Sequence, residues 1–402
     1  MKELMRNKVF RIVAAADLLQ QAAIWIRNIA LLFYIMEQTG NDPVAVSLLT
    51  VFEYLPIFLF SFIGGTLADR WNPKKTMIIG DFLSSVSIAV ILLFVAFGWW
   101  QAVFAATIVS AVVSQFSQPS SAIMFKRHIP DEQVSTAIGI TQSLMSLFVI
   151  VGPMIGTLVY TMLGIETSLI LLIALFLISS LIQLALPNSS KIKADPIQRS
   201  ILGEMKEGLS YVRRSRNLLV IAVSFAFIGL GSGIIQPLDV YIVIDRLQLA
   251  KEDIQWFYVL SGIGMLVGGG AAAMFAHKLN PKVVTFIGIA FLSISIVVEV
   301  LSVWVALTAT MRLLVGVMMA FMQIVLSSIM IKSVDEAYVG RVSGTITPII
   351  MAGMLLGSSM SGVLMNSITL IPTYCLAAGI IFIAALSSLK FNFKENNKVP
   401  AA

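Results

Sequence analysis

Long apolar stretches separated by short polar segments set the pattern of this chain. Between Asp81 and Lys126, and again between Arg341 and Lys390, no Asp, Glu, Lys, Arg or His occurs. At ~1.5 Å rise per residue, each stretch would form a helix of roughly 65–70 Å, about twice the ~30 Å hydrocarbon core of a bilayer. Each stretch therefore predicts two antiparallel helices, with reversals at residues 97–101 and 366–372.

The same pattern over the whole sequence predicts an all-α integral membrane protein with twelve transmembrane helices. Strand-period alternation is absent, and only helices and closed barrels can span lipid. The predicted spans are residues 10–37, 44–68, 75–97, 100–125, 134–161, 166–186, 217–243, 254–276, 282–303, 306–331, 340–366 and 370–390.

The composition agrees with a membrane protein. Hydrophobic residues make up 58% of the chain and charged residues 12%, whereas soluble domains carry about 25% charged residues. The single cysteine, Cys375, excludes an internal disulfide and a cysteine metal cluster, and we expect no metal and no cofactor. The basic N-terminus lacks a small-residue cleavage site after a short apolar core, so we expect no signal peptide.

Lysines and arginines are distributed unevenly between the two sets of loops. Of the 27, 23 fall in the two terminal segments and in the loops on the same side of the membrane, whereas only Arg246 and Lys251 fall in loops on the other side. The positive-inside rule then predicts a multi-pass protein of the cell membrane with both termini cytoplasmic. This bias accounts for the net charge of +6. We therefore expect the lipid bilayer to be a partner of the protein and nucleic acid not to be one.

The chain divides into two halves that repeat each other. Residues 68–80 align with residues 276–288, sharing Ala, Asn-Pro-Lys and Ile-Gly, and Asp131-Glu132 matches Asp335-Glu336 at nearly the same offset. We expect a six-helix bundle over 1–186, a cytoplasmic linker over 187–216 and a second six-helix bundle over 217–402. In the linker, Met205, Leu209 and Val212 follow helical spacing and predict an amphipathic helix on the membrane surface; a plain solvated linker is the alternative.

The loop after the second span carries a sequence that resembles a family motif. Residues 65–75 read Gly-Thr-Leu-Ala-Asp-Arg-Trp-Asn-Pro-Lys-Lys. They are similar to the Gly-x-Leu-Ala-Asp-Arg-x-Gly-Arg-Lys loop of the major facilitator superfamily, whose fold is a 6+6 helical repeat. The resemblance implies that Asp69 lies against the start of the eleventh helix when the cytoplasmic side is closed, and so biases alternating access. The gating residues implied are Gly65, Asp69, Arg70, Lys74 and Arg341.

The fifth span is similar to the antiporter signature of that superfamily. Its glycines and proline in register are Gly139, Gly152, Pro153 and Gly156, while Phe148 and Thr157 replace further glycines. A proline removes one backbone hydrogen bond and allows a kink, either for packing alone or, in an exporter, to limit leak between the halves. Within the superfamily, the chain resembles the macrolide-efflux and enterobactin-exporter branch in three segments, Pro130–Gln133, Glu204–Gly208 and Gly340–Val342.

Polar residues on the first span form the main candidate site for substrate or proton coupling. At 100° per residue, one stripe about 120° wide holds Asp17, Gln20, Gln21, Arg27 and Asn28. Ionisable groups inside a membrane usually face a cavity or a partner. We expect Arg27 to pair with Glu53, which lies at the same depth in the second span, either structurally or in competition with a proton or substrate. Asp17 is either a proton-carrying carboxylate in the cavity or a snorkelling residue near the helix end.

Other polar residues are expected to have lesser roles. Asp81 is interpreted as a structural partner of the loop cations, and Glu299 and Arg312 are expected to pair near the outer membrane surface. The fourth span carries serines at helical spacing that favour close packing, and Gln115 and Gln118 beside them could line a polar cavity. The span lacks the embedded arginine of many drug antiporters. Because Asp69, Arg70 and the polar face of the first span all lie in residues 1–186, the second half is interpreted as the more apolar wall.

These features predict a secondary active transporter that exports small amphipathic drugs or metabolites by alternating access, with protons moving in the opposite direction. No phosphate-binding Gly-x-x-x-x-Gly-Lys-Ser/Thr motif is present, so ATP is not the expected energy source. Export of a siderophore, peptide or lysolipid by the same fold is the alternative. A membrane enzyme or a channel is disfavoured, because neither a Ser-His constellation nor a filter-like re-entrant loop is evident. By family resemblance we expect a monomer.

Overall fold

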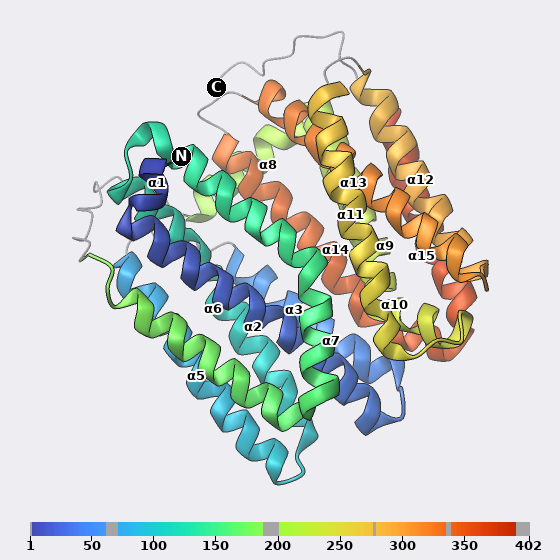
Figure 1. Cartoon of the computed structure of the whole chain (residues 1–402). Coiled ribbons are helices and arrows are strands. Elements are labelled where there is room, and N and C mark those ends of the chain that lie inside the picture. Colours follow the sequence, from blue (N-terminus) through green and yellow to red (C-terminus); the bar gives the residue numbers. More distant parts are fainter. Residues whose placement is uncertain (1, 62–70, 188–200, 276–278, 335–338, 391–402) are drawn as a thin grey trace. The chain divides into compact units, whose positions relative to one another are not determined.

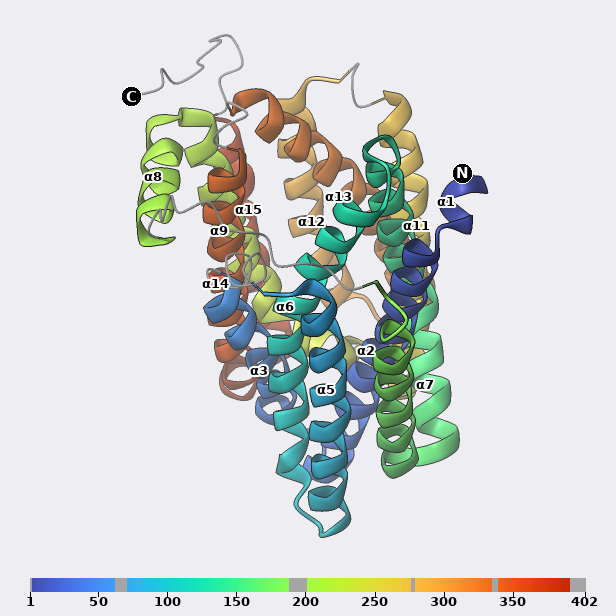
Figure 2. The ribbon, with the colours of Figure 1, turned by 90° about the vertical axis from the view of Figure 1, so that its left-hand side faces the viewer.

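The structure is a computed structural model that describes residues 2–61, 71–187, 201–275, 279–334 and 339–390. Within these ranges, 11 helices are long and apolar enough to cross a membrane, and one of them, α7, is long enough to cross it twice. The all-α architecture predicted from the apolar stretches is thus confirmed. The chain folds into two compact units (Figures 1 and 2), formed by residues 1–41 with 55–198 and by residues 42–54 with 199–402. The bundle and linker boundaries expected from the sequence stay a prediction.

Unit 1 is built from the first part of the chain. Its helices are α1 (Lys2–Arg6), α2 (Lys8–Thr39), the end of α3 (Pro43–Ser61), α5 (Pro73–Ala96), α6 (Val103–His128) and α7 (Asp131–Gln183). The most extensive contacts join α2 to α7, and α5 packs on both α6 and α7. In unit 1, α7 therefore packs against both α2 and α5.

The helix α7 contains two antiparallel segments. Gly164 has φ 71° and ψ −176°, a backbone conformation far from helical that glycine adopts without a steric penalty. The chain turns back there, as Figure 1 shows in green. The two segments correspond to the predicted fifth and sixth spans, so the twelve-helix pattern is complete.

Unit 2 is built mainly from the second part of the chain. Its helices are α8 (Ile201–Arg214), α9 (Arg216–Ile235), η2 (Gln236–Leu238), α10 (Asp239–Tyr241), η3 (Ile242–Arg246), η4 (Lys251–Asp253), α11 (Ile254–Phe275), α12 (Pro281–Leu301), α13 (Val305–Ser333), α14 (Val339–Ile368) and α15 (Leu370–Ser388). The seventh span is thus interrupted, since α9 continues through short 3₁₀, α and π turns to Arg246.

Both predicted reversals in the charge-free stretches are present. The first lies between the end of α5 at Ala96 and the start of α6 at Val103, and includes Gly98 with φ 84°. The second lies at Thr369, whose φ of 71° ends α14 and starts α15. A positive φ at a non-glycine residue is uncommon, so this reversal is tightly constrained by the helices on each side.

The sequence repeat has a structural counterpart at two helix starts. Asn72 caps α5 by accepting a hydrogen bond from the Lys75 amide, and Asn280 caps α12 by accepting one from the Lys282 amide. In each case proline occupies the first turn, where its missing N–H costs nothing. The shared Asn-Pro-Lys sequence therefore specifies the same local structure in both units.

Glycines allow close helix packing inside unit 2. Gly233 of α9 lies directly against the backbone of Met354 in α14, and Gly357 of α14 lies against the carbonyl of Leu230. A side chain at either glycine would overlap the facing backbone. Close approach through small residues is how membrane helices gain packing energy in the absence of a hydrophobic drive between them.

The linker contains a helix, α8, in the segment where the sequence predicts an amphipathic one, and its place on the membrane surface stays a prediction. Its apolar residues Tyr211 and Val212 are buried in a cluster that includes Val334 and Val342 of unit 2. Leu209 remains 39% exposed. The helix therefore uses part of its apolar face to pack within unit 2, mainly against α9 and α14, and presents Leu209 outward.

Candidate functional site

A buried carboxylate joins three helices of unit 1. Asp81 of α5 is 1% exposed. Gln20 of α2 donates to both of its carboxylate oxygens at 2.9 Å, and Ser179 and Gln183 of α7 each donate to Oδ2 at 2.6 Å. The interpretation of Asp81 as a partner of the loop cations is wrong for the described part of the chain, because its donors there are uncharged side chains.

Asp17 lies next to this group on the same face of α2. Its Oδ1 atom accepts a hydrogen bond from Ser121 of α6 at 3.5 Å, the outer limit of such a bond. Gln21 is partly buried on the neighbouring face. The polar stripe predicted for the first span is therefore divided, since Gln20 is fixed by Asp81 while Asp17 has only a weak contact with α6.

Arg27 is buried on α2, near the middle of the helix, with 3% of its surface exposed. Its Nε and Nη2 atoms donate to Asn28 Oδ1 at 3.1 and 2.7 Å. The structure therefore brings two of the predicted site residues together. Glu53 is partly buried in the portion of α3 that belongs to unit 2, and its pairing with Arg27 stays a prediction.

The antiporter-like glycines of α7 lie against α2. Gly156 faces the carbonyl of Trp25, and a Cβ there would lie 2.8 Å from that oxygen and 2.9 Å from Ile29 Cβ. Gly152 faces the ring of Trp25, again without room for a side chain. Pro153 is buried between them, whereas Gly139 faces open space. Two of the three glycines therefore bring α7 onto the helix that carries Arg27.

Part of the predicted gating set lies outside the described residues. This applies to Gly65, Asp69 and Arg70, and to the side chain of Arg341, whose backbone begins α14. Lys74 is described, and its Nζ donates to the Leu186 carbonyl at 2.5 Å. Lys74 thus ties the start of α5 to the chain that follows α7.

The described polar residues of α6 make contacts within the helix and with α2 and α5. Gln115 is partly buried and donates to Ser114 at 3.4 Å, while the side chain of Gln118 lies outside the described residues. Ser117 faces Gly80 of α5, where an added Cβ would lie 3.1 Å from its Oγ. The expectation that small residues permit close approach of this helix is confirmed at that contact.

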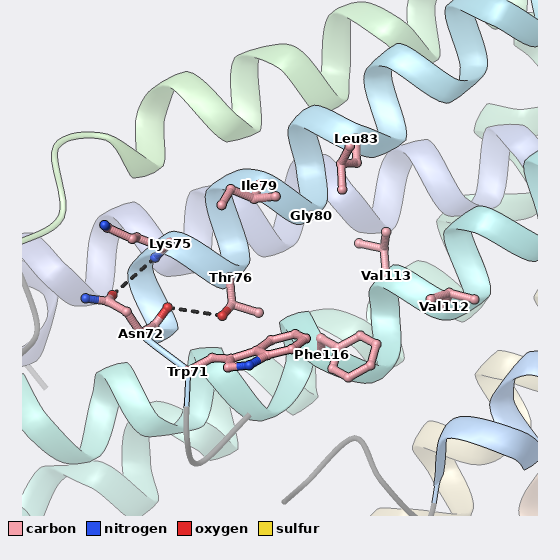
Figure 3. A pocket seen from close by; sticks show the side chains of 10 residues that line it. All are labelled: Trp71, Asn72, Lys75, Thr76, Ile79, Gly80, Leu83, Val112, Val113 and Phe116. Carbon is pink, nitrogen blue, oxygen red and sulfur yellow. Dashed lines mark hydrogen bonds between the residues drawn. The ribbon is translucent and has the colours of Figure 1, made fainter. Parts of the chain in front are cut away.

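A cavity of about 610 Å³ lies beside α5 and α6 in unit 1. Figure 3 shows Asn72 and Lys75 at its polar end and Trp71 next to Phe116, with ring centroids 5.3 Å apart. The remaining walls are mostly apolar and include Val113. Its volume falls in the range of drug-sized ligand sites, and its lining suits an amphipathic molecule.

Unit 2 contains a buried cluster of three charged side chains. Arg312 of α13 donates through Nη1 and Nη2 to the two carboxylate oxygens of Asp239, at 3.2 and 3.0 Å. Its Nε lies 2.8 Å from Glu299 Oε2 of α12. Side-chain exposures are 15% for Arg312, 14% for Asp239 and 6% for Glu299. Tyr374 of α15 donates to Asp239 Oδ1 at 3.4 Å.

The predicted pairing of Glu299 with Arg312 is confirmed, but the view of the second half as an apolar wall is wrong. Sequence reasoning misses Asp239, although it stands inside an apolar span and the rule applied to Asp17 and Arg27 also covers it. Its neighbours in space come from α13 and α15, which no local pattern identifies. The described part of the chain holds no group of three His, Cys, Asp or Glu side chains arranged for a metal ion.

The fold defines a class of proteins: polytopic membrane proteins with two helical units. The sequence profile of the Major Facilitator Superfamily matches residues 13–347. The chain belongs to this superfamily, and it is a multi-pass membrane protein with the twelve-helix fold of these transporters.

Relatives of known sequence cover most of the chain. It is 25% identical over 364 residues to the uncharacterized MFS-type transporter YkuC of Bacillus subtilis (strain 168), an alignment that covers 87% of this chain and 84% of that protein. It is 22% identical over 375 residues to macrolide efflux protein A of Streptococcus pyogenes, with 90% of each chain covered.

Solved structures agree on the fold. The nucleoside transporter NupG superposes with a TM-score of 0.76 at 14% identity, covering 95% of this chain and 98% of that one. A D-xylose–proton symporter gives a TM-score of 0.73 at 13% identity, covering 96% and 97% of the two chains. Identities this low support the shared fold alone.

Proposed function

We propose that this transporter exports amphipathic drugs or metabolites across the cell membrane in exchange for protons. The observation that carries the proposal is the similarity to macrolide efflux protein A, which extends over 90% of both chains. An alignment of this length includes both units, so a drug-efflux relative is matched as a whole transporter and not through one shared segment.

The cavity beside α5 and α6 supports an amphipathic substrate. Its polar end is lined by Asn72 and Lys75, and its walls include the rings of Trp71 and Phe116. Binding sites for small molecules are mostly apolar with few polar groups that fix orientation. A compound with one polar end and an apolar body matches that division.

The buried ionisable groups support ion coupling. Charges inside membrane segments are costly and are retained mainly at ion or substrate pathways. The candidates are Asp17 and Arg27 of α2, Glu53 of α3, and the Asp239–Arg312–Glu299 cluster of unit 2. A proton exchanged at one of these carboxylates would link the inward proton gradient to outward movement of the drug.

The expected gating contact completes the proposal. With both termini cytoplasmic, Asp69 ends the second span on the cytoplasmic side, and an acidic group favours a helix N-terminus such as the start of α14 by ~0.3–1 kcal/mol. Arg341 would strengthen that contact when the cytoplasmic side closes. We propose that a monomer performs the whole cycle.

Accumulation of a radiolabelled macrolide in cells that lack their own efflux pumps tests the function. Expression of the transporter should lower accumulation, and a protonophore should restore it. Unchanged accumulation for a panel of macrolides and cationic dyes contradicts drug export. Lowered accumulation that persists when the proton gradient is collapsed contradicts proton coupling and leaves export standing.

A further inference from the structure

The charged cluster of unit 2 has an excess of negative charge. Arg312 stays protonated at every physiological pH, whereas Asp239 and Glu299 supply two carboxylates around it. With both acids ionised, the cluster carries a net charge of −1 among side chains that are at most 15% exposed. One added proton would make it neutral, which a membrane interior favours.

The two carboxylates are held differently. Asp239 accepts hydrogen bonds from both terminal nitrogens of Arg312, a paired arrangement that is strong. It also accepts a hydrogen bond from the hydroxyl of Tyr374. Glu299 meets the same guanidinium through one contact, from its Oε2 atom to Arg312 Nε at 2.8 Å, and not through the paired terminal nitrogens. Asp239 is therefore the better stabilised anion, and Glu299 is the acid that gains most from a proton.

Glu299 lies close to the end of α12. It lies two residues before the last residue of α12, Leu301, which is about 3 Å along the axis. The segment that follows α12 is exposed, with Val303 at 58% and Trp304 at 71%. The carboxylate therefore lies near the side of the membrane on which α12 and α13 are connected, which the lysine and arginine bias predicts to be the outside.

The other titratable groups around Glu299 come from several further elements. Asp239 and Arg312 belong to the cluster itself; Tyr374 of α15 and Tyr258 of α11 interact electrostatically with them. Arg246 of η3 donates to the carbonyls of Val300 and Leu301, next to Glu299 in sequence. Both tyrosines are neutral hydroxyls at physiological pH, so the cluster's proton resides on a carboxylate.

We propose that Glu299 is the residue that binds and releases the coupled proton, with Arg312 and Asp239 as its positioning partners. This inference rests on the proposed proton-driven export and names its coupling site. A proton from outside binds one carboxylate oxygen of Glu299, and the same proton leaves to the opposite side when the transporter reorients. While Glu299 is ionised, it competes with Asp239 for Arg312, so the proton changes how firmly α10, α12 and α13 are held together.

Infrared difference spectroscopy of the full-length protein in liposomes tests the site without any drug. A pH step should reveal a protonated carboxyl band that shifts when all glutamates carry ¹³C in the carboxyl position and disappears in Glu299→Gln. The band should persist in Glu37→Gln, a control that removes a carboxylate hydrogen-bonded to Tyr160 at 2.7 Å. A band that does not shift on glutamate labelling, or that persists in Glu299→Gln, overturns the assignment. The labelling experiment uses the wild-type protein and so does not depend on the folding of a variant.

Transport of radiolabelled erythromycin in the same liposomes separates this inference from the proposed function. Glu299→Gln should lose gradient-driven accumulation by about tenfold or more, a typical size for a coupling between two sites, while exchange of drug for drug without a gradient continues. Gradient-driven accumulation at the wild-type rate in Glu299→Gln overturns the inference. A wild-type protein that never accumulates erythromycin contradicts the proposed function instead, and the infrared assignment still decides the proton site.

Discussion

Asn72 and Asn280 have the same structural role in the two units. Each caps a helix whose first turn contains proline, by accepting a backbone hydrogen bond from the residue two or three positions later. The equivalence relates two helices far apart in sequence, α5 and α12, and shows that the repeat is structural. It also provides a pair of matched sites at which the contribution of local sequence to stability can be measured.

Replacement of either asparagine by alanine should remove one cap. We expect Asn72→Ala and Asn280→Ala each to lower stability by about 0.5–2 kcal/mol, because a first-turn N–H loses its acceptor. Thermal unfolding of the purified protein in detergent measures the effect. Serine at either position retains a capping oxygen and should restore most of it; equal stability of the alanine and serine variants would contradict the capping role.

The close contact of α7 with α2 predicts a contrast between two glycines of one motif. Gly156→Ala places a Cβ 2.8 Å from the Trp25 carbonyl, and overpacking of this kind costs about 1–3 kcal/mol. Gly139→Ala meets nothing within 4 Å and should be neutral or stabilising by up to about 1 kcal/mol, since alanine is the better helix former. Melting temperatures of the two variants, compared in the same detergent, test this. The same sign of shift in both would count against the packing account.

The hydrogen bonds to Asp81 predict that this residue is structural. Asp81→Asn replaces one acceptor oxygen by a donor that faces Gln20, Ser179 and Gln183. Leaving buried polar groups unsatisfied costs about 1–3 kcal/mol. Asp17→Asn, which alters a single contact of 3.5 Å, should change the melting temperature far less. If Asp17→Asn proves the more destabilising of the two, the assignment of Asp81 as the centre of this network is wrong.

The cluster around Arg312 predicts a strongly asymmetric response to neutralisation. Arg312→Gln leaves two buried carboxylates without their cation, and breaking a buried ion pair in this way costs about 3–5 kcal/mol. Glu299→Gln removes the excess charge and should leave stability close to that of the wild type. Adding Asp239→Asn to Arg312→Gln should recover part of the loss. The expression yield and the melting temperature of the three variants test this. Equal losses of stability in Arg312→Gln and Glu299→Gln would contradict the excess negative charge of the cluster.

The hydrophobic pattern is sufficient to predict the fold because each span is long, apolar and bounded by charge or by turn residues. The reversals near Gly98 and Thr369 and the repeat at Asn-Pro-Lys follow from local chemistry. The reversal within α7 depends on a single glycine, Gly164, which falls in the predicted connection between the fifth and sixth spans.

The candidate sites are less predictable, because they depend on which helices become neighbours. The Glu299–Arg312 pair can be predicted from the sequence, because the two residues lie at similar membrane depth on either side of one short connection between adjacent spans. The sequence suggests charged partners for Asp81, whereas its donors are two glutamines and a serine from helices separated widely in sequence. Asp239 is identifiable as a charge within an apolar span, but its pairing with Arg312 depends on how α13 is placed beside α10.

The most direct test of proton-coupled export is a measurement of both fluxes in one preparation. In liposomes that contain the purified transporter and a trapped pH dye, an imposed erythromycin gradient should drive protons in the direction opposite to the drug. The proton flux should vanish when the drug gradient is omitted. Drug movement at a measurable rate with no accompanying proton flux would contradict the account.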